Sequence, residues 1–491
     1  MIFGRKGLNN MGKKSLKHEV FNGMFWRFGE QISSQLASFI ISIVLARLLT
    51  PKEYGVVAIM MVFISIANVF ITEGFGSALI QKKKADNIDF SSVFFFNFFF
   101  SWVVYLVVFV LAPIIAHFYK LPILTNAMRV LALVLPISGI NSIQQSYVSR
   151  NMIFQRFFWS SLVGTILSGI IGIIMAYNKM GIWALVGQQI SSSLINTLVL
   201  WFTVKWRPIF VFEFDRLKEL LSFGWKMLVT NLINTLYDNL RSLIMGKVYS
   251  STDLAYYNRG MNYPSLIVSN ITISISSVLF PAMSKIQDDK KKMKTAIKDS
   301  IAVSTYLLFP MMAGLAAVAT NLISIMLTDK WLPAVPYMRI ACIYFALYPI
   351  NITNLQAMNA IGRSDIYLKL SIIKKSIGII CILISIPFGP YAMAASEIFV
   401  GIFAILVNVY PNKKLFNYTL YELGHDCFKN LIMSILLFII VYLSQNWIYI
   451  IPNRLVVLLI QIIIGVISYI DLSILFKSRE YKYILDVLKK H

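Results

Sequence analysis

The chain has 491 residues, of which 58% are hydrophobic and 14% charged, and its formal net charge is +23. This composition excludes an ordinary soluble domain and a disordered chain. The Lys and Arg residues are concentrated at the chain ends and in short connections between apolar stretches, a pattern typical of membrane topology. We therefore expect a multi-pass membrane protein with no nucleic-acid partner.

Long apolar stretches run through the whole chain. A transmembrane helix needs about 20 mainly apolar residues to cross the bilayer core. The stretches predict an all-α polytopic protein of about 14 transmembrane helices. Their approximate ranges are 21–46, 55–79, 91–116, 122–148, 157–177, 181–204, 219–247, 262–284, 299–327, 335–358, 366–387, 390–410, 430–447 and 455–475.

The distribution of Lys and Arg predicts the topology. They are most frequent in both terminal segments and in the even-numbered connections, above all in 285–298. Under the positive-inside rule, both termini are cytoplasmic. The run at 285–298 could also bind anionic lipid headgroups, but an orientation signal is the simpler interpretation. The long first apolar stretch predicts an uncleaved helix and not a signal peptide.

The scattered cysteines and histidines predict neither a disulfide framework nor a metal site. The chain holds three Cys, two of them within predicted spans, and four His that are far apart in sequence. We therefore expect no metal ion and no catalytic residues.

An offset of about 200 residues relates the first predicted span to the seventh. Trp26-Arg27 aligns with Trp225-Lys226, and Leu45-Ala46-Arg47 aligns with Met245-Gly246-Lys247. Repeats in the same orientation are typical of transporters whose substrate site lies between two halves. The predicted organisation is a cytoplasmic segment 1–20, a six-helix lobe 21–204, a linker 205–218, a second six-helix lobe 219–410, a two-helix appendage 411–475 and a cytoplasmic segment 476–491.

Ionisable side chains inside the predicted spans are the strongest functional signal. A charge at the bilayer centre costs about 2.5 to 3.5 kcal/mol, so such residues normally face a protein interior or a water-filled cavity. Arg27 and Lys226 occupy similar depths in the first and seventh spans, where they could hold an anionic group or extend to lipid headgroups. The other candidate substrate-binding cations are Arg241, Lys374 and Lys375.

Acidic and amide side chains within the spans are candidates for ion coupling or for structural hydrogen bonds. Glu30 lies one turn from Arg27, and Asp238 lies one turn from Arg241. Intramembrane carboxylates can carry a proton or coordinate sodium, whereas buried amides often join helices. The remaining candidates in this group are Gln31, Glu73, Asn231 and Glu397.

Two motifs carry a family resemblance. The segment 45–55, Leu-Ala-Arg-Leu-Leu-Thr-Pro-Lys-Glu-Tyr-Gly, is followed by Glu-Gly-Phe-Gly-Ser-Ala-Leu-Ile-Gln at 73–81. Together they resemble the opening of Wzx-type polysaccharide transporters. These belong to the MOP (multidrug, oligosaccharidyl-lipid, polysaccharide) exporter superfamily, which also includes MATE-like transporters. The number of spans, the repeat and Val-Leu-Phe-Pro at 278–281 fit the same resemblance.

The resemblance implies a flippase rather than an enzyme. Its substrate would be an undecaprenyl-pyrophosphate-linked oligosaccharide moved from the cytoplasmic to the periplasmic leaflet of the bacterial inner membrane, for O-antigen, capsule or exopolysaccharide assembly. The implied partners are this substrate, membrane lipids and other polysaccharide-assembly membrane proteins. A proton or sodium ion is the candidate coupling ion, and no other cofactor is implied.

Three alternatives remain at this point: another exporter of the same superfamily, a membrane polysaccharide polymerase, and a non-transporting scaffold, which would leave the cost of the charged spans unexplained. An exporter of a lipid-linked peptidoglycan precursor or of drugs would share the same superfamily, although a drug exporter should have a more acidic cavity. A membrane polysaccharide polymerase, which is an enzyme, should have large outer loops, whereas the outer connections here are short.

Overall fold

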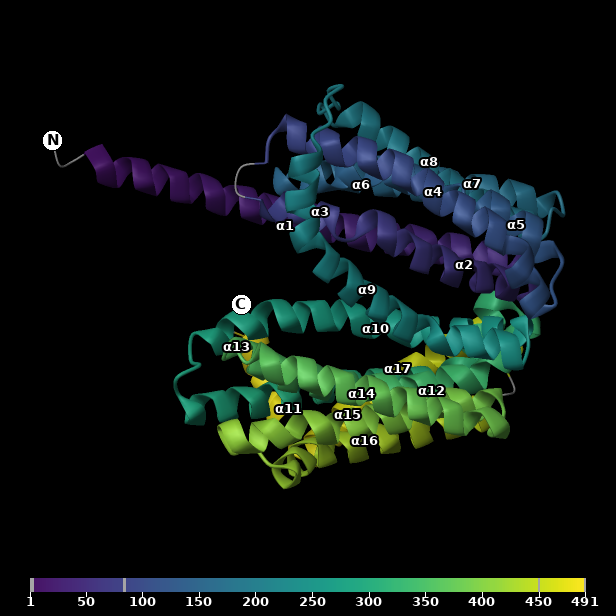
Figure 1. Cartoon of the computed structure of the whole chain (residues 1–491). Coiled ribbons are helices and arrows are strands. Elements are labelled where there is room, and N and C mark those ends of the chain that lie inside the picture. Colours follow the sequence, from purple (N-terminus) through teal and green to yellow (C-terminus); the bar gives the residue numbers. More distant parts are fainter. Residues whose placement is uncertain (1–3, 83–84, 449–450, 490–491) are drawn as a thin grey trace. The chain divides into compact units, whose positions relative to one another are not determined.

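The computed structural model describes residues 4–82, 85–448 and 451–489, and every regular element among them is a helix (Figure 1). Helices correspond in position to all fourteen predicted spans. Twelve of the described helical segments are long and apolar enough to cross a membrane. The other two spans correspond to α8 and α9, whose amide or charged side chains reduce their apolar character. The predicted fold class is confirmed.

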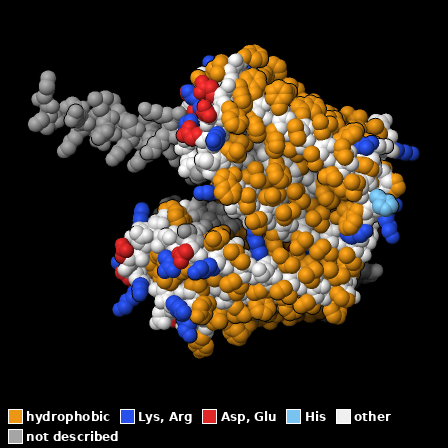
Figure 2. All heavy atoms as spheres, viewed as in Figure 1, with side chains coloured by type: hydrophobic (Ala, Val, Ile, Leu, Met, Phe, Trp, Pro, Cys, Tyr) orange, Lys and Arg blue, Asp and Glu red, His pale blue; other side chains and the backbone are white. Residues whose placement is uncertain are grey.

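Apolar side chains cover most of the visible surface of each unit (Figure 2). On both units Lys, Arg, Asp and Glu gather toward the ends of the helices, and the broad middle is apolar. Exposed large apolar side chains are numerous along α4, α7 and α17, as in Val110, Ile174 and Ile463. A surface of this kind is stable only against hydrocarbon, which agrees with a transmembrane bundle.

The contacts between helices divide the chain into two compact units, residues 1–254 and 255–491. In the first unit α1 packs against α7, α7 packs against α8, and α9 packs against α2, α3 and α4. The predicted lobes were defined by the repeat and not by contacts, and they stay a prediction. The helices of the first unit are α1 (Gly4–Leu48), α2 (Pro51–Thr72), α3 (Phe75–Gln81), α4 (Asn87–Tyr119), α5 (Ile123–Leu131), α6 (Val134–Arg150), α7 (Gln155–Tyr177), α8 (Ile182–Thr203) and α9 (Phe214–Val248).

The second unit is built around the long helix α11, which packs against α12, α13, α16 and α17. α10 begins at the end of the first unit and continues into the second. The helices are α10 (Ser251–Ser284), α11 (Lys290–Leu327), η1 (Asp329–Ala334), α12 (Val335–Ala346), α13 (Tyr348–Ala360), α14 (Ser364–Ser385), η2 (Ile386–Phe388), α15 (Pro390–Phe416), α16 (Leu420–Ile448), α17 (Arg454–Leu475) and α18 (Arg479–Lys489).

Three predicted spans are interrupted in the structure. The second breaks between α2 and α3 at Gly74, whose φ of 95° favours glycine. The fourth breaks between α5 and α6, and the tenth between α12 and α13, at short non-helical joints that precede Pro136 and Pro349. Proline cannot donate the hydrogen bond that a continuous helix needs, which agrees with a joint at these two positions.

Prolines inside continuous helices leave carbonyl groups that other side chains bind. Pro113 in α4 cannot bond to the carbonyl of Phe109, and the Nε of Arg129 in α5 donates to that oxygen at 3.3 Å. Pro310 in α11 frees the carbonyl of Tyr306, which accepts a hydrogen bond from the hydroxyl of Tyr469 at 2.7 Å. These bonds satisfy polar backbone groups where no water is available.

Matching helix caps support the internal repeat. Thr50 caps α2, and Glu53 completes a capping box by accepting the Thr50 N–H at 2.6 Å. Two hundred residues later, the Ser250 hydroxyl accepts the Asp253 N–H at 3.0 Å and donates to the Asp253 carboxylate at 2.6 Å. The repeated segments therefore share the signal that ends one long helix and starts the next.

Two glycines allow the α2–α3 joint to contact the backbone of α9. A Cβ added to Gly224 would lie 2.8 Å from the backbone C and O of Gly74. Only residues without side chains permit this approach, because backbone atoms cannot move aside as a flexible side chain can.

We expect Gly224→Ala to lower the free energy of unfolding by about 1–3 kcal/mol, the usual cost of overpacking. The measurement is the thermal unfolding midpoint of the purified protein in detergent. Gly424→Ala in α16 is the matched control, since its added Cβ meets nothing within 4 Å. Equal midpoints for the two variants would contradict the proposed backbone contact.

Candidate functional site

Arg27 and Glu30 form an ion pair on α1, with 2.7 Å between the Arg27 Nη1 and the Glu30 carboxylate. The Arg27 side chain is 56% exposed and that of Glu30 is 13% exposed. The Arg27 guanidinium also lies 5.3 Å from the ring centre of Phe157 in α7. Gln31, the next residue, is half-buried. Arg27 is thus held in place but accessible, and an anion that binds it must compete with Glu30.

Lys226 is exposed on α9, two residues beyond the backbone contact at Gly224. The glycine contact fixes this part of α9 against the joint between α2 and α3, and so sets the position of the Lys226 backbone. Lys226 on α9 and Arg27 on α1 both belong to the first unit, whereas the repeat assigned them to different predicted lobes.

Glu73 and Asn231 meet where α2 ends. Glu73 is the C-cap residue of α2, and its N–H bonds to the Val69 carbonyl. The Asn231 amide on α9 donates to the Glu73 carboxylate at 2.7 Å. The structure therefore joins two candidates that lie 158 positions apart in the chain. A partly buried carboxylate bonded to an amide can serve as a structural link or exchange a proton.

Asp238 and Arg241 lie three residues apart on α9 but differ in burial. Arg241 is 7% exposed, whereas Asp238 is an exposed residue. Their spacing places them on one side of the helix within a single turn. The buried guanidinium indicates that Arg241 is part of the packed first unit, so Asp238 is the more accessible of the two.

Lys374, Lys375 and Glu397 belong to the second unit. Both lysines are half-buried on α14, which packs against α13 and α15. Glu397 on α15 accepts a hydrogen bond of 2.6 Å from the hydroxyl of Tyr257 on α10. This tyrosine is a partner that sequence reasoning missed, because nothing in the local pattern around 257 points to position 397.

An ion-pair cluster at the start of α9 was also missed. Arg216 binds Asp86 at 2.7 Å and lies 3.5 Å from Asp89, while Lys82 binds Asp89 at 3.0 Å and Glu219 at 2.9 Å. Asp89 is fully buried. The only sequence signal was the capping box that Asp86 and Asp89 form at the start of α4. The cluster fastens the start of α9 to the segment before α4.

Hydrogen bonding to Arg216 lowers the pKa of Asp86 below its ordinary value of 3.8. Because the pKa of Asp86 is lower in the folded state, the pair contributes its full stability at any pH above the pKa of Asp86 in the unfolded state. The contribution is lost only as the pH falls through the lowered pKa. The pair of Asp86 with Arg216 is therefore intact at neutral pH.

Among the described residues, no group of three or more His, Cys, Asp or Glu side chains lies close enough to hold a metal ion. The candidates instead form a set of cations and hydrogen-bonded carboxylates distributed over long apolar helices. Such a set is chemically suited to binding an anionic or protonatable group within a membrane.

The arrangement of the helices matches that of known membrane transporters. The lipid II flippase MurJ, in an inward closed conformation, aligns with a TM-score of 0.74 and 19% sequence identity over 94% of this chain and 100% of the MurJ chain. A multidrug resistance MATE family transporter of the MOP superfamily aligns with a TM-score of 0.63 and 14% identity over 78% of this chain and 95% of that chain. The fold is that of a MOP-superfamily membrane transporter.

Comparison with known sequences narrows the class of transporter to which the chain belongs. The profile of the family described as "Polysaccharide biosynthesis protein" matches residues 44–336, more than half of the chain, which therefore belongs to that family. The teichuronic acid biosynthesis protein TuaB of Bacillus subtilis (strain 168) is 24% identical over 72% of this chain and 73% of its own length. The lipopolysaccharide biosynthesis protein WzxC of Escherichia coli (strain K12) is 22% identical over 73% and 74%. These matches confirm the resemblance to Wzx-type transporters.

The cluster at the start of α9 predicts that the effects of two substitutions on the free energy of unfolding are not additive. Lys82→Gln or Arg216→Gln alone leaves Asp89 with one cation and should cost about 1 kcal/mol, as for partly exposed pairs. The double variant leaves a buried carboxylate without either cation and should cost about 3–5 kcal/mol. Thermal unfolding of the three variants in detergent, with Lys52→Gln as a surface control, measures the difference. Strict additivity of the two single effects would contradict a shared cluster.

Proposed function

We propose that this protein is a flippase for an undecaprenyl-pyrophosphate-linked oligosaccharide, and not an enzyme. The proposal depends mainly on one observation: exposed or half-buried cations interrupt the apolar helices of a polysaccharide biosynthesis protein with a transporter fold. The headgroup of such a lipid carries negative charge and sugar hydroxyls, and cations within the membrane would bind the charge. The final glycan would be an O-antigen, capsule or exopolysaccharide.

Arg27 and Lys226 have complementary properties for this task. A guanidinium binds two phosphate oxygens at once, whereas an ammonium acts as a point charge on a flexible stem. In the flippase mechanism, the headgroup enters a water-filled cavity while the prenyl chain stays in lipid, and alternating access carries the headgroup to the periplasmic leaflet. The pair with Glu30 would loosen as Arg27 binds the pyrophosphate. Lys374 and Lys375, half-buried on α14 of the second unit, would be further candidate ligands, whereas Arg241 is buried within the first unit.

Glu30, Glu73, Asp238 and Glu397 are the candidates for coupling to a proton or sodium gradient. Protonation of Glu30 would release Arg27 from its ion pair and so favour binding of the anionic headgroup. The bonds from Asn231 to Glu73 and from Tyr257 to Glu397 give the other two carboxylates neutral partners, which protonation would rearrange. Sodium would instead need carboxylate and amide oxygens together.

The short connections of the structure do not favour a polysaccharide polymerase. The longest connection between consecutive helices is 204–213, which leaves no room for a large loop domain there. The positive balance of the intramembrane charges also disfavours export of cationic drugs. For a flippase of this kind we propose the bacterial inner membrane, cytoplasmic termini and contacts with other polysaccharide-assembly membrane proteins.

The central test replaces both proposed headgroup ligands, with Arg27→Gln and Lys226→Gln in one chain. Each lost charged hydrogen bond is worth about 1.5–3 kcal/mol, so we expect transport to fall at least about ten-fold. The measurement is the appearance of lipid-linked glycan in the outer leaflet, after membrane insertion has been confirmed. Lys52→Gln with Lys120→Gln is the matched control, because both lysines lie at helix ends. Full transport by the double variant would remove these cations from the mechanism.

A second test addresses coupling. In sealed membranes, we expect collapse of the coupling gradient to reduce transport, and Glu30→Gln to reduce the dependence on that gradient. Protonophore and sodium ionophore are added separately and then together while outer-leaflet glycan is measured. Transport that stays the same after both gradients are collapsed would show a passive flippase.

A further inference from the structure

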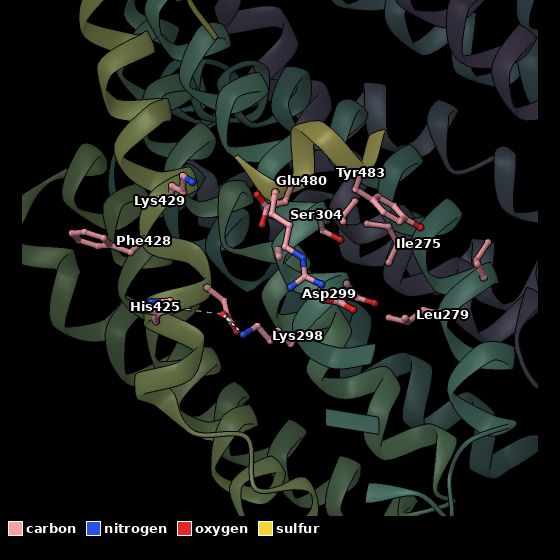
Figure 3. Close-up of a pocket in the computed structure, with 16 residues that line it drawn as sticks. Ile275, Leu279, Lys298, Asp299, Ser304, His425, Phe428, Lys429, Glu480 and Tyr483 are labelled. Carbon is pink, nitrogen blue, oxygen red and sulfur yellow. Dashed lines mark ion pairs between the residues drawn. The ribbon is translucent and has the colours of Figure 1, made fainter. Parts of the chain in front are cut away.

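The second unit contains a pocket beside α11 and α18 (Figure 3), and none of the residues that line it is among the candidates discussed above. Its volume is about 990 Å³, and its walls come from α10, α11, α16 and α18. In the close-up, Phe428 and Lys429 lie on one side, and Ile275, Leu279 and Tyr483 lie on the other. The volume is at the upper end of the range for small-molecule sites, about 300–1,000 Å³.

Two cations of the pocket remain available to an anion. Lys429 donates to the backbone carbonyl of Lys477 at 3.0 Å, a bond that leaves its positive charge uncompensated. Arg479 is 81% exposed, and its guanidinium lies 3.9 Å from Asp299, too far for a strong hydrogen bond. These two cations come from different helices, α16 and α18, and both line the same pocket.

Two other charged groups of the pocket form an ion pair, and Glu480 has only a neutral partner among the described residues. Lys298 pairs with Asp426 at 3.2 Å, and Asp426, whose side chain is 5% exposed, also accepts from the Tyr418 hydroxyl at 3.1 Å. Glu480 accepts a hydrogen bond of 2.8 Å from Ser478. Lys429 and Arg479 are therefore the cations available to an anion, and two carboxylates of the same pocket, Asp299 and Glu480, compete for them.

Apolar side chains extend the pocket toward the lipid-facing surface of the protein. Ile275, Val278 and Leu279 lie on one side of α10, where the i, i+3, i+4 spacing places them together. Val278 is 71% exposed and Phe428 is 62% exposed. Charged and exposed apolar groups at one site are typical of the boundary between headgroups and acyl chains.

We propose that this pocket binds an anionic glycerophospholipid of the leaflet on the side of the Lys290–Lys294 segment. Its phosphate would bind Lys429 and Arg479, and the upper parts of its acyl chains would cover Val278, Ile275 and Phe428. A free phosphate ion would leave the apolar wall exposed, so the combined lining favours a lipid over a soluble anion. The site lies within one unit and does not depend on the proposed transport function.

The first experiment measures lipid binding to the delipidated full chain in nonionic detergent by native mass spectrometry. Phosphatidylglycerol and phosphatidylcholine with identical acyl chains are titrated separately. We expect preferential binding of phosphatidylglycerol, weakened about thirty-fold by Lys429→Gln with Arg479→Gln, from about 1 kcal/mol for each cation. The control pair, Lys413→Gln with Lys414→Gln, removes exposed cations at the end of α15 and should leave the preference unchanged.

Two further variants keep both cations and therefore test the site without removing its ligands. Asp299→Asn removes one of the two competing carboxylates and should tighten phosphatidylglycerol binding. Val278→Asp places a negative charge on an exposed part of the apolar wall and should weaken it. These outcomes decide the proposal even if the double variant fails to fold in size-exclusion chromatography.

Competition distinguishes the possible ligands. Inorganic phosphate should not displace phosphatidylglycerol, and undecaprenyl pyrophosphate should not replace it at equal concentration. Efficient displacement by inorganic phosphate would overturn the assignment to a lipid. Tighter binding of undecaprenyl pyrophosphate that depends on Lys429 and Arg479 would assign the pocket to the substrate of the proposed function. Equal binding of both phospholipids by the unmodified chain would overturn the site itself.

Discussion

The absence of water in the bilayer core is the constraint on which this structure depends, because every polar group there needs a partner within the protein. The bond from Arg129 to the carbonyl that Pro113 frees, and the bond from Tyr469 to the carbonyl that Pro310 frees, satisfy this requirement for the backbone. Carboxylates follow the same rule, as Glu73 and Glu397 show with their amide and phenol partners. Kinked helices and intramembrane acids are therefore compatible with a stable bundle.

The same constraint separates structural charges from functional candidates. Arg129 is occupied by a carbonyl, and Arg241 is buried within the first unit, so packing explains their presence. Lys226 is exposed on α9, at a position where an outward-facing apolar residue would be more stable in a membrane. A charge that packing does not require, in a chain of this family, is explained most directly by a ligand that it binds. The accessible side of Arg27 supports the same interpretation.

The sequence predicted what depends on local pattern. Apolar length located the helices, and the repeat of Leu45-Ala46-Arg47 as Met245-Gly246-Lys247 was visible at a fixed offset. Pairings between distant helices, such as Asn231 with Glu73, leave no such trace, because they depend on how helices pack. The break at Gly74 was hidden within a continuous apolar stretch, and the α18 pocket is assembled from four helices. The roles of the candidate site residues stay predictions.

The contacts of α9 restrict how any transport movement can occur. α9 is held against the rest of the first unit at three points along its length. Arg216 binds Asp86, Asn231 binds Glu73, and the Tyr119 hydroxyl donates to the Leu243 carbonyl at 3.2 Å. The backbone contact of Gly224 with Gly74 adds a fourth. A movement that separated α9 from the rest of the first unit would break all of them together, whereas a hinge in the short segment between α9 and α10 would preserve them. The hinge movement costs less free energy, because it breaks none of these contacts. It would also keep Lys226 in the same unit as Arg27 throughout the transport cycle.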